Sequence, residues 1–310
     1  MTKSLATVNG IEISQTELFR VRPEKHASGF APSGKVNTHQ WGSNRSHFIG
    51  LGMEFAESRV YQAGDDVKNI DWRVTARTGQ THTKLYQEER ERPVHILLDL
   101  RSMMHFGSRN RFKSHLAAEI AAKVAWIAHD GGDRVGGLIC HKQGCSDFRA
   151  SRTRRSLLRL LDNISQNTRL AQEVNQESSL AMSIRRLRHH ARSGGLVFII
   201  SDFSDLDDKC EGELKKISAR NQVTLIHIED PFDARLPLSG GRLSDGQSVL
   251  SLSALSPHSE QEYRLLFSQR LSKLEGLCRQ YRMVLQRMST IDDPSVLFAT
   301  KYRKNSRRAI

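Results

Sequence analysis

Two short, largely apolar runs in this chain are each followed by an aspartate. The first run is Val94–Leu98, which leads to Asp99, and the second is Leu196–Ser201, which leads to Asp202. Runs of this length are typical of strands that are buried on both faces of a parallel sheet. In open sheets of that kind, ligands bind beyond the carboxyl ends of the strands. We therefore expect both aspartates at one edge of one α/β sheet.

From Pro93 onward, apolar runs alternate with helical patterns, which predicts a doubly wound, mostly parallel sheet. The clearest helical pattern is Arg111–His129, where apolar residues recur every three or four positions and Gly131 and Gly132 follow. The expected strands are Val94–Leu98, Arg134–Cys140, Leu196–Ser201, Val223–Ile228 and Met283–Met288. The other expected helices are Leu157–Ile164, Leu180–Ala191, Glu211–Arg220 and Glu260–Tyr281.

The N-terminal part of the chain has a different pattern. It is largely irregular, with strand patterns only at Met53–Tyr61 and Lys84–Glu88. The sequence therefore predicts an N-terminal region over residues 1–90, an α/β domain over 91–303 and a basic tail over 304–310. Within the α/β domain, Gly240–Ala254 carries an Asp-Gly turn between alternating segments, which predicts a hairpin.

Composition limits the class of protein. Hydrophobic residues make up 38% of the 310 residues, and no apolar stretch is long enough for a signal peptide or a membrane span, so we expect a cytoplasmic protein. The four cysteines lack zinc-site spacing. A net charge of +13 gathers at Arg152–Arg159, Arg185–Arg192 and Lys301–Arg308. These clusters suit nucleic acid, anionic lipid or an acidic protein, but solvated helix faces explain them more simply, and no aromatic residues alternate with them.

Several segments together resemble one family. They are RVYQAGDDVKNIDWRVTARTGQTHTKLYQEERERPVHILLDL, the following FG, and then GDRVGGLIC, FIISDFSD and RLSDG. This set is similar to the domain-of-unknown-function family 58, and the likeness runs from about Gly50 to Ala299. The resemblance implies a von Willebrand factor A-like domain. It also implies a partner, a MoxR-type AAA+ ATPase, with which such proteins are thought to assemble or mature other proteins.

The resemblance further implies a metal-ion-dependent adhesion site. Its ligands would be Asp99, Asp202 and, at the threonine position, Ser178. The two serines of the family pattern D-x-S-x-S are replaced here by Arg101 and Met103. Because Mg²⁺ prefers hard oxygen ligands, a guanidinium and a thioether leave the site degenerate, empty or only weakly able to bind Mg²⁺.

Arg101 offers a physical alternative to the metal. It lies two residues after Asp99, and a guanidinium binds carboxylates through two parallel hydrogen bonds. We expect Arg101 to neutralise Asp99 and Asp202 together, and then to donate hydrogen bonds to a partner's carboxylate. Ser102 and Ser204 would border this partner-binding face.

A second acidic group precedes the α/β domain. It consists of Asp65, Asp66 and Asp71, with Trp72 beside them. Clustered carboxylates suggest a metal-dependent phosphoesterase, with Glu89 as a further ligand. The alternative is structural: aspartates make turn hydrogen bonds, and Trp72 packs the N-terminal region onto the main domain or contacts a partner. We favour the second interpretation, because no histidine or lysine completes a hydrolytic site.

Together these observations predict a non-enzymatic protein-interaction module that binds acidic partners at the Asp99 and Asp202 edge. The resemblance makes the partner a MoxR-type ATPase, a client protein or both. A metal-dependent phosphoesterase and a nucleic-acid-binding protein are the alternatives.

Overall fold

A computed structural model of the protein describes residues 10–23, 53–88, 93–170, 177–191, 193–237, 241–244, 249–252 and 256–298. The chain forms two compact units. Unit 1 comprises Met1–Ala31 and Arg92–Ile310, and unit 2 comprises Pro32–Glu91.

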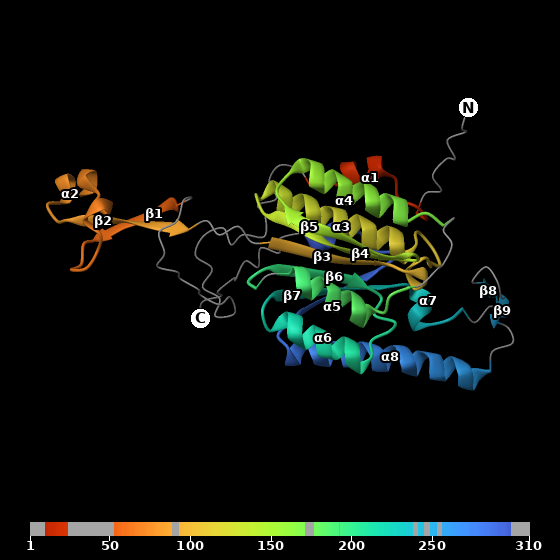
Figure 1. Ribbon diagram of the computed structural model, residues 1–310. Helices are drawn as coiled ribbons and strands as arrows, with labels where there is room; N and C mark the ends of the chain where they lie inside the picture. The colour runs from red at the N-terminus through yellow and green to blue at the C-terminus, as the bar shows by residue number, and fades with distance from the viewer. Residues whose placement is uncertain are drawn as a thin grey trace, which may run out of the picture. The chain divides into compact units, whose positions relative to one another are not determined.

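Unit 1 is built on a six-stranded sheet with the strand order β10-β7-β6-β3-β4-β5 (Figure 1). Every neighbouring pair is parallel except β4 and β5, which are antiparallel. The strands are β3 (Pro93–Leu100), β4 (Arg134–His141), β5 (Gly144–Ser151), β6 (Leu196–Ser201), β7 (Gln222–Glu229) and β10 (Val284–Ser289). The five strands expected from the apolar runs are present, and β5 is an additional one.

Helices cover both faces of this sheet, so the predicted doubly wound α/β architecture is confirmed. Figure 1 shows α1, α3 and α4 on one face and α5, α6 and α8 on the other. Alternate residues of β3 face the two layers: Ile96 and Leu98 belong to the first apolar core, and Leu97 belongs to the second. The helices are α1 (Gln15–Arg20), α3 (Lys113–Asp130), α4 (Arg154–Asn167), α5 (Leu180–His190), α6 (Asp208–Ser218), α7 (Pro231–Ala234) and α8 (Pro257–Gln280).

Helix α3 is the central helix of the first layer. Leu116, Ile120 and Val124 are fully buried, and the alanines between them are buried too, so the helix lies close to the sheet. It ends at Asp130 with Gly131 as its C-cap, and Gly132 follows with a φ of 82°, a left-handed conformation that glycine adopts readily. Its first residue, Lys113, is only 2% exposed, although it is charged.

The N-terminal segment belongs to unit 1, whereas the sequence pattern grouped it with the rest of residues 1–90. Helix α1 begins with a capping box between Ser14 and Glu17. Leu18 is fully buried in the first core, and its carbonyl oxygen accepts a hydrogen bond from Trp126 Nε1 at 3.0 Å. A six-residue helix gives too short a periodic pattern to be recognised in the sequence.

Unit 2 is a small hairpin with a helical connection. Strand β1 (Met53–Val60) pairs antiparallel with β2 (His82–Glu88), where strands were expected. Between them lie the 3₁₀ helix η1 (Val67–Asn69) and α2 (Trp72–Thr78).

The predicted hairpin of unit 1 is also present. It consists of β8 (Arg242–Ser244) and β9 (Val249–Ser251), which pair antiparallel. Its Asp245–Gly246 turn lies outside the described residues. Among the helices of the described ranges, none has the length and apolar character needed to cross a bilayer.

Candidate functional site

The two aspartates that follow the apolar runs lie at the carboxyl edge of the sheet. Asp99 is near the end of β3, and Asp202 directly follows β6, which is the parallel neighbour of β3. Asp99 is 1% exposed and Asp202 is 4% exposed. Buried carboxylates need compensating partners, and the structure supplies a separate cation for each.

Arg101 forms an ion pair with Asp99. Its Nε donates to Asp99 Oδ1 at 2.9 Å, and its Nη2 donates to Asp99 Oδ2 at 2.7 Å. The same guanidinium also holds Asp205, with Nη1 to Oδ2 at 2.7 Å and Nη2 to Oδ1 at 3.0 Å. A further hydrogen bond runs from Nη1 to the carbonyl oxygen of Ser178 at 3.1 Å. These five bonds match the five N–H groups of a guanidinium.

Their mutual contacts favour the charged forms of Arg101 and Asp205. Burial by itself lowers the pKa of Arg101, but hydrogen bonds and charge interactions with Asp99 and Asp205 raise it overall. Burial likewise raises the pKa of Asp205, but the bond from Arg101 and the backbone N–H of Leu180, 2.8 Å away, lower it overall. The cluster is therefore an internal ion-pair network in which Arg101 bridges two carboxylates.

Asp202 is neutralised by Lys113 rather than by Arg101, which corrects our expectation that Arg101 serves both aspartates. Lys113 Nζ donates to Asp202 Oδ2 at 2.9 Å and lies 3.4 Å from Asp233 Oδ2. Burial would raise the pKa of Asp202, but the Lys113 charge lowers it overall. Burial raises the pKa of Asp233. Lys113 replaces Arg101 as the partner of Asp202 because the first turn of α3 places its ammonium group beside that carboxylate.

The loop that follows β6 is held by hydrogen bonds to these acids. Ser201 Oγ donates to Asp99 Oδ2 at 2.7 Å and accepts the backbone N–H of Phe203 at 3.0 Å. The backbone N–H of Ser204 donates to Asp202 Oδ1 at 3.1 Å. Phe203 is fully buried and has a φ of 50°, a left-handed conformation that is uncommon outside glycine. These hydrogen bonds hold the loop, and its backbone is strained at Phe203.

The residues at this edge do not fit a divalent ion. The guanidinium of Arg101 lies between Asp99 and Asp205, and Ser178 contributes its carbonyl oxygen to that guanidinium. Ser102 Oγ donates instead to Glu177 Oε1 at 2.6 Å. In the described ranges, no group of three or more acidic, histidine or cysteine side chains is arranged to hold a metal.

Arg101 is also closed to a partner. It is 8% exposed, and all its N–H groups are used within the chain. The expectation that it donates hydrogen bonds to a partner's carboxylate is therefore wrong for this arrangement. Two apolar side chains near the cluster are exposed: Met103, in the 3₁₀ helix η2 (Ser102–Met104), is 60% exposed, and Met182, in the first turn of α5, is 64% exposed.

Sequence reasoning did not assign roles to two residues of the site, Lys113 and Asp233, and it did not pair Asp205 with Arg101. A lysine at the start of an otherwise apolar helix is a usable signal, because such a position is buried and must be paired. Asp205 carries a weaker signal, since it lies in the polar segment after β6.

A family model described as "Protein of unknown function DUF58" matches residues 57–270. The chain belongs to the DUF58 family. Uncharacterised proteins of Mycobacterium bovis and Mycobacterium tuberculosis are each 34% identical to it over 188 residues, which is 61% of this chain and 58% of theirs. The chain thus spans less than two thirds of the length of these relatives.

Solved structures similar to this DUF58 protein include two bacterial ones. An aerotolerance-related membrane protein from Bacteroides fragilis has 17% identity and a TM-score of 0.44, covering 67% of this chain and 94% of that one. A von Willebrand factor type A protein from Catenulispora acidiphila has 11% identity and a TM-score of 0.36, covering 71% of this chain and 42% of that one.

In unit 2 of this DUF58 protein, each aspartate of the acidic group has a local structural role. Asp65 accepts hydrogen bonds from the Gln62 backbone at 2.9 Å and from Arg59 at 2.7 Å. Asp66 caps η1. Asp71 caps α2 and accepts the Ser58 hydroxyl at 2.8 Å. These bonds support the structural interpretation over a hydrolytic site, and Glu89 lies outside the described residues.

Trp72 follows this group at the first position of α2. Its side chain is 69% exposed, and Val60 and Val67 of the same unit are 50% and 62% exposed. Packing of Trp72 onto the main domain stays a prediction. Within unit 2, the indole is available for contact with another surface.

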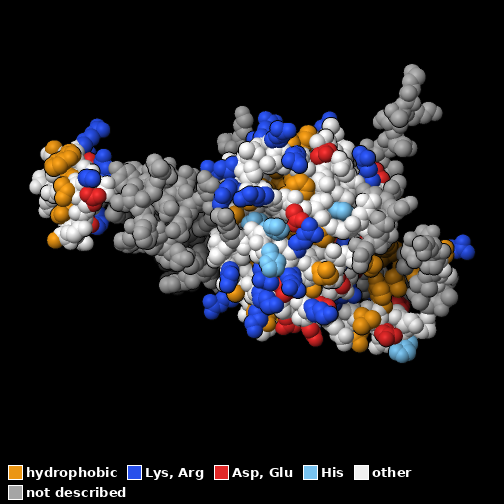
Figure 2. Space-filling model, viewed as in Figure 1, with side chains coloured by type: hydrophobic (Ala, Val, Ile, Leu, Met, Phe, Trp, Pro, Cys, Tyr) orange, Lys and Arg blue, Asp and Glu red, His pale blue; other side chains and the backbone are white. Residues whose placement is uncertain are grey.

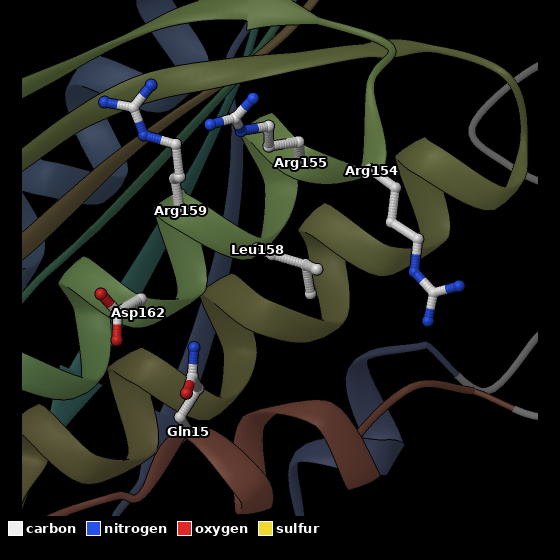
Figure 3. Close-up of a pocket in the computed structure, with 6 residues that line it drawn as sticks. All are labelled: Gln15, Arg154, Arg155, Leu158, Arg159 and Asp162. Atoms are coloured by element: carbon white, nitrogen blue, oxygen red, sulfur yellow. The ribbon is translucent and has the colours of Figure 1, made fainter.

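The basic clusters of unit 1 form exposed, mixed surfaces. Arg154, Arg155 and Arg159 of α4 border a cavity of about 470 Å³, together with Gln15, Leu158 and Asp162. Arg155 and Arg159 extend to the same side of the helix, whereas Arg154 points away from them (Figure 3). Acidic side chains are interspersed with Lys and Arg on the visible face of this unit (Figure 2). The basic tail lies outside the described residues. A mixed surface of this kind matches solvated helix faces better than a nucleic-acid groove.

Proposed function

We propose that this DUF58 chain is a cytoplasmic, non-enzymatic protein-interaction module. Its partner in this proposal is a MoxR-type AAA+ ATPase, with which it assembles or matures other proteins. Membership of the DUF58 family supports the proposal, because the family resemblance implies both the adhesion-type domain and the ATPase.

The observation that carries the proposal is that side chains of the protein itself neutralise the buried aspartates at the sheet edge. Arg101 and Lys113 hold the buried aspartates without an ion, and Ser201 fixes the loop between them. A general acid or base needs an accessible group in a reactive protonation state. These acids are instead buried and ion-paired. The edge therefore suits a preformed docking surface better than a catalytic centre.

The docking surface we propose is apolar and flanks the Arg101 cluster. Met103 follows Arg101 by two residues, and Met182 lies in the helix whose N-terminal flank, at Ser178, contacts Arg101. Methionine side chains are flexible and polarisable, so they adapt to different apolar partner surfaces. The rigid network beneath them keeps their backbones in place, which lowers the entropy lost on binding.

Site-specific photo-crosslinking tests this surface and its partner. A photoreactive amino acid replaces Met103 or Met182 in the full chain, and the purified MoxR-type ATPase of the same organism is added with nucleotide. Both positions are expected to crosslink to the ATPase. Leu265 on α8 is the matched control, because it is 53% exposed and apolar but lies on another element.

Two results would count against the proposal. Equal crosslinking from Leu265 would remove the assigned surface. Absence of any complex between the two purified proteins, by crosslinking and by gel filtration, would remove the ATPase as the partner.

A further inference from the structure

Cys140 and Cys145 lie directly opposite each other in the antiparallel β4–β5 hairpin. Their sulfur atoms are 3.7 Å apart, and both thiols are reduced. Opposite residues of antiparallel strands have Cα atoms about 4.5–5.5 Å apart, which falls within the range that a disulfide requires. A bond between these sulfurs therefore needs only a small movement of the two side chains.

The two thiols differ in accessibility. Cys140 is 1% exposed, so it is shielded from solvent. Cys145 is only partly buried and lines a cavity of about 310 Å³, whose other lining residues are Ser178, Met182, Ser183, Arg185, Arg186 and His189. A small reagent can thus reach Cys145 through the cavity, whereas Cys140 is not accessible to it.

The surroundings also shift the pKa values of the two thiols in opposite directions. The hydrogen bond with Cys140, those with Ser178 and Ser183, and the charge of Arg186 lower the pKa of Cys145 to about 6. The same bond between the thiols, and burial, raise the pKa of Cys140. Burial raises the pKa of Cys210 to about 12 and that of Cys278 to about 11. Of the four cysteines, Cys145 is the one whose pKa is lowered, which favours its thiolate form.

We propose that Cys145 is a site of oxidation by hydrogen peroxide and that Cys140 resolves it into an intramolecular disulfide. The Cys145 thiolate attacks one peroxide oxygen, the O–O bond breaks, and hydroxide leaves, so the sulfur becomes a sulfenic acid. The Cys140 sulfur then attacks the Cys145 sulfur. The sulfenic hydroxyl leaves as water with the Cys140 proton. In total, one thiolate, one thiol and one peroxide give a disulfide, a hydroxide and a water.

This site adjoins the Arg101 cluster. Cys140 is in register with Asp99 on the neighbouring strand. Arg101 Nη1 donates to the carbonyl oxygen of Ser178, and Ser178 lines the same cavity as Cys145. A disulfide with Cys140 changes the contact between the Cys145 sulfur and Ser183 Oγ, which are 3.8 Å apart, in the helix that follows the segment that anchors Arg101.

Peroxide treatment of the full chain at neutral pH, followed by peptide mass spectrometry without reduction, tests the proposal. The wild type is expected to give a Cys140–Cys145 crosslinked peptide within one chain. Cys140→Ser is expected to accumulate a sulfenic acid at residue 145 that dimedone traps. Cys145→Ser is expected to show no fast oxidation, and Cys278→Ser, the control, is expected to behave as the wild type.

Alkylation by iodoacetamide gives an independent readout that does not require a variant to fold. Cys145 is expected to react at least about tenfold faster than Cys278 at neutral pH, because its larger thiolate fraction outweighs its lower intrinsic nucleophilicity. Its rate is expected to rise with a midpoint near the pKa of about 6. The proposal would be overturned if both thiols stay reduced after peroxide, or if disulfides form only between chains. It would also be overturned if iodoacetamide alkylates Cys145 no faster than Cys278.

Discussion

Arg101→Ala is expected to lower the free energy of unfolding by about 3–5 kcal/mol, because removing one partner of a buried ion pair leaves an uncompensated charge. Asp99 is 1% exposed and would keep only Ser201 Oγ and the backbone N–H of residue 101 as hydrogen-bond donors. Asp205 would lose its guanidinium contacts as well. Urea denaturation followed by circular dichroism measures the effect.

Arg264→Ala provides the matched control for this prediction. Arg264 pairs with Glu260 on α8, and its side chain is 45% exposed. An exposed pair of this kind contributes no more than about 1 kcal/mol. If Arg101→Ala destabilises the chain no more than Arg264→Ala does, Arg101 is not the buried counter-ion of the site.

Lys113→Met is expected to destabilise the protein by a similar amount, about 3–5 kcal/mol. Methionine approximates the length of the lysine stem but removes the charge, so Asp202 and Asp233 would face each other without a cation. Thermal and urea unfolding both measure the loss. The double variant Lys113→Met with Asp202→Asn is expected to recover part of the stability, because it also removes a buried negative charge.

Lys273→Met is the control for Lys113→Met. Lys273 pairs with Asp208, and its side chain is 38% exposed, so its loss is expected to change the free energy of unfolding by less than about 1 kcal/mol. A Lys113→Met variant as stable as Lys273→Met would contradict the assigned role. So would a double variant that is less stable than the sum of its single changes.

The parallel part of the fold could be predicted because its strands are buried on both faces. Such strands appear as apolar runs, and all seven residues of Val94–Leu100 are buried. Strand β5 escaped notice because its sequence, GCSDFRAS, is largely polar and only partly buried at the sheet edge. Edge strands carry this mixed pattern, and their pairing depends on the neighbouring strand rather than on their own sequence.

The ion pairs of the site could be predicted only where the two partners are close in sequence. Arg101 was expected to replace a metal as the partner of Asp99, because it follows Asp99 by two positions at the end of one strand. Lys113 and Asp202 are 89 residues apart, and their contact depends on how α3 begins relative to β6. Sequence patterns define that helix, but they do not define which carboxylate its first turn approaches.

Two cations thus neutralise the acids of the sheet edge, and one of them, Arg101, stands at a serine position of the related pattern. Each cation bridges two carboxylates: Arg101 contacts Asp99 and Asp205, and Lys113 contacts Asp202 and Asp233. A guanidinium carries its charge at any pH the protein meets. The docking edge we propose would therefore be independent of ion supply, unlike a site completed by Mg²⁺.

Unfolding temperature with and without excess Mg²⁺ or Mn²⁺ tests the built-in cation most directly, with wild type and Arg101→Ser measured side by side. The wild type is expected to show no shift, because the guanidinium fills the position between the carboxylates. Arg101→Ser introduces a hydroxyl and frees two carboxylates, so ion binding is expected to stabilise it by about 1.4 kcal/mol when the ion is at ~10 times its dissociation constant. A wild type stabilised by either ion, with Arg101 intact, would contradict the account.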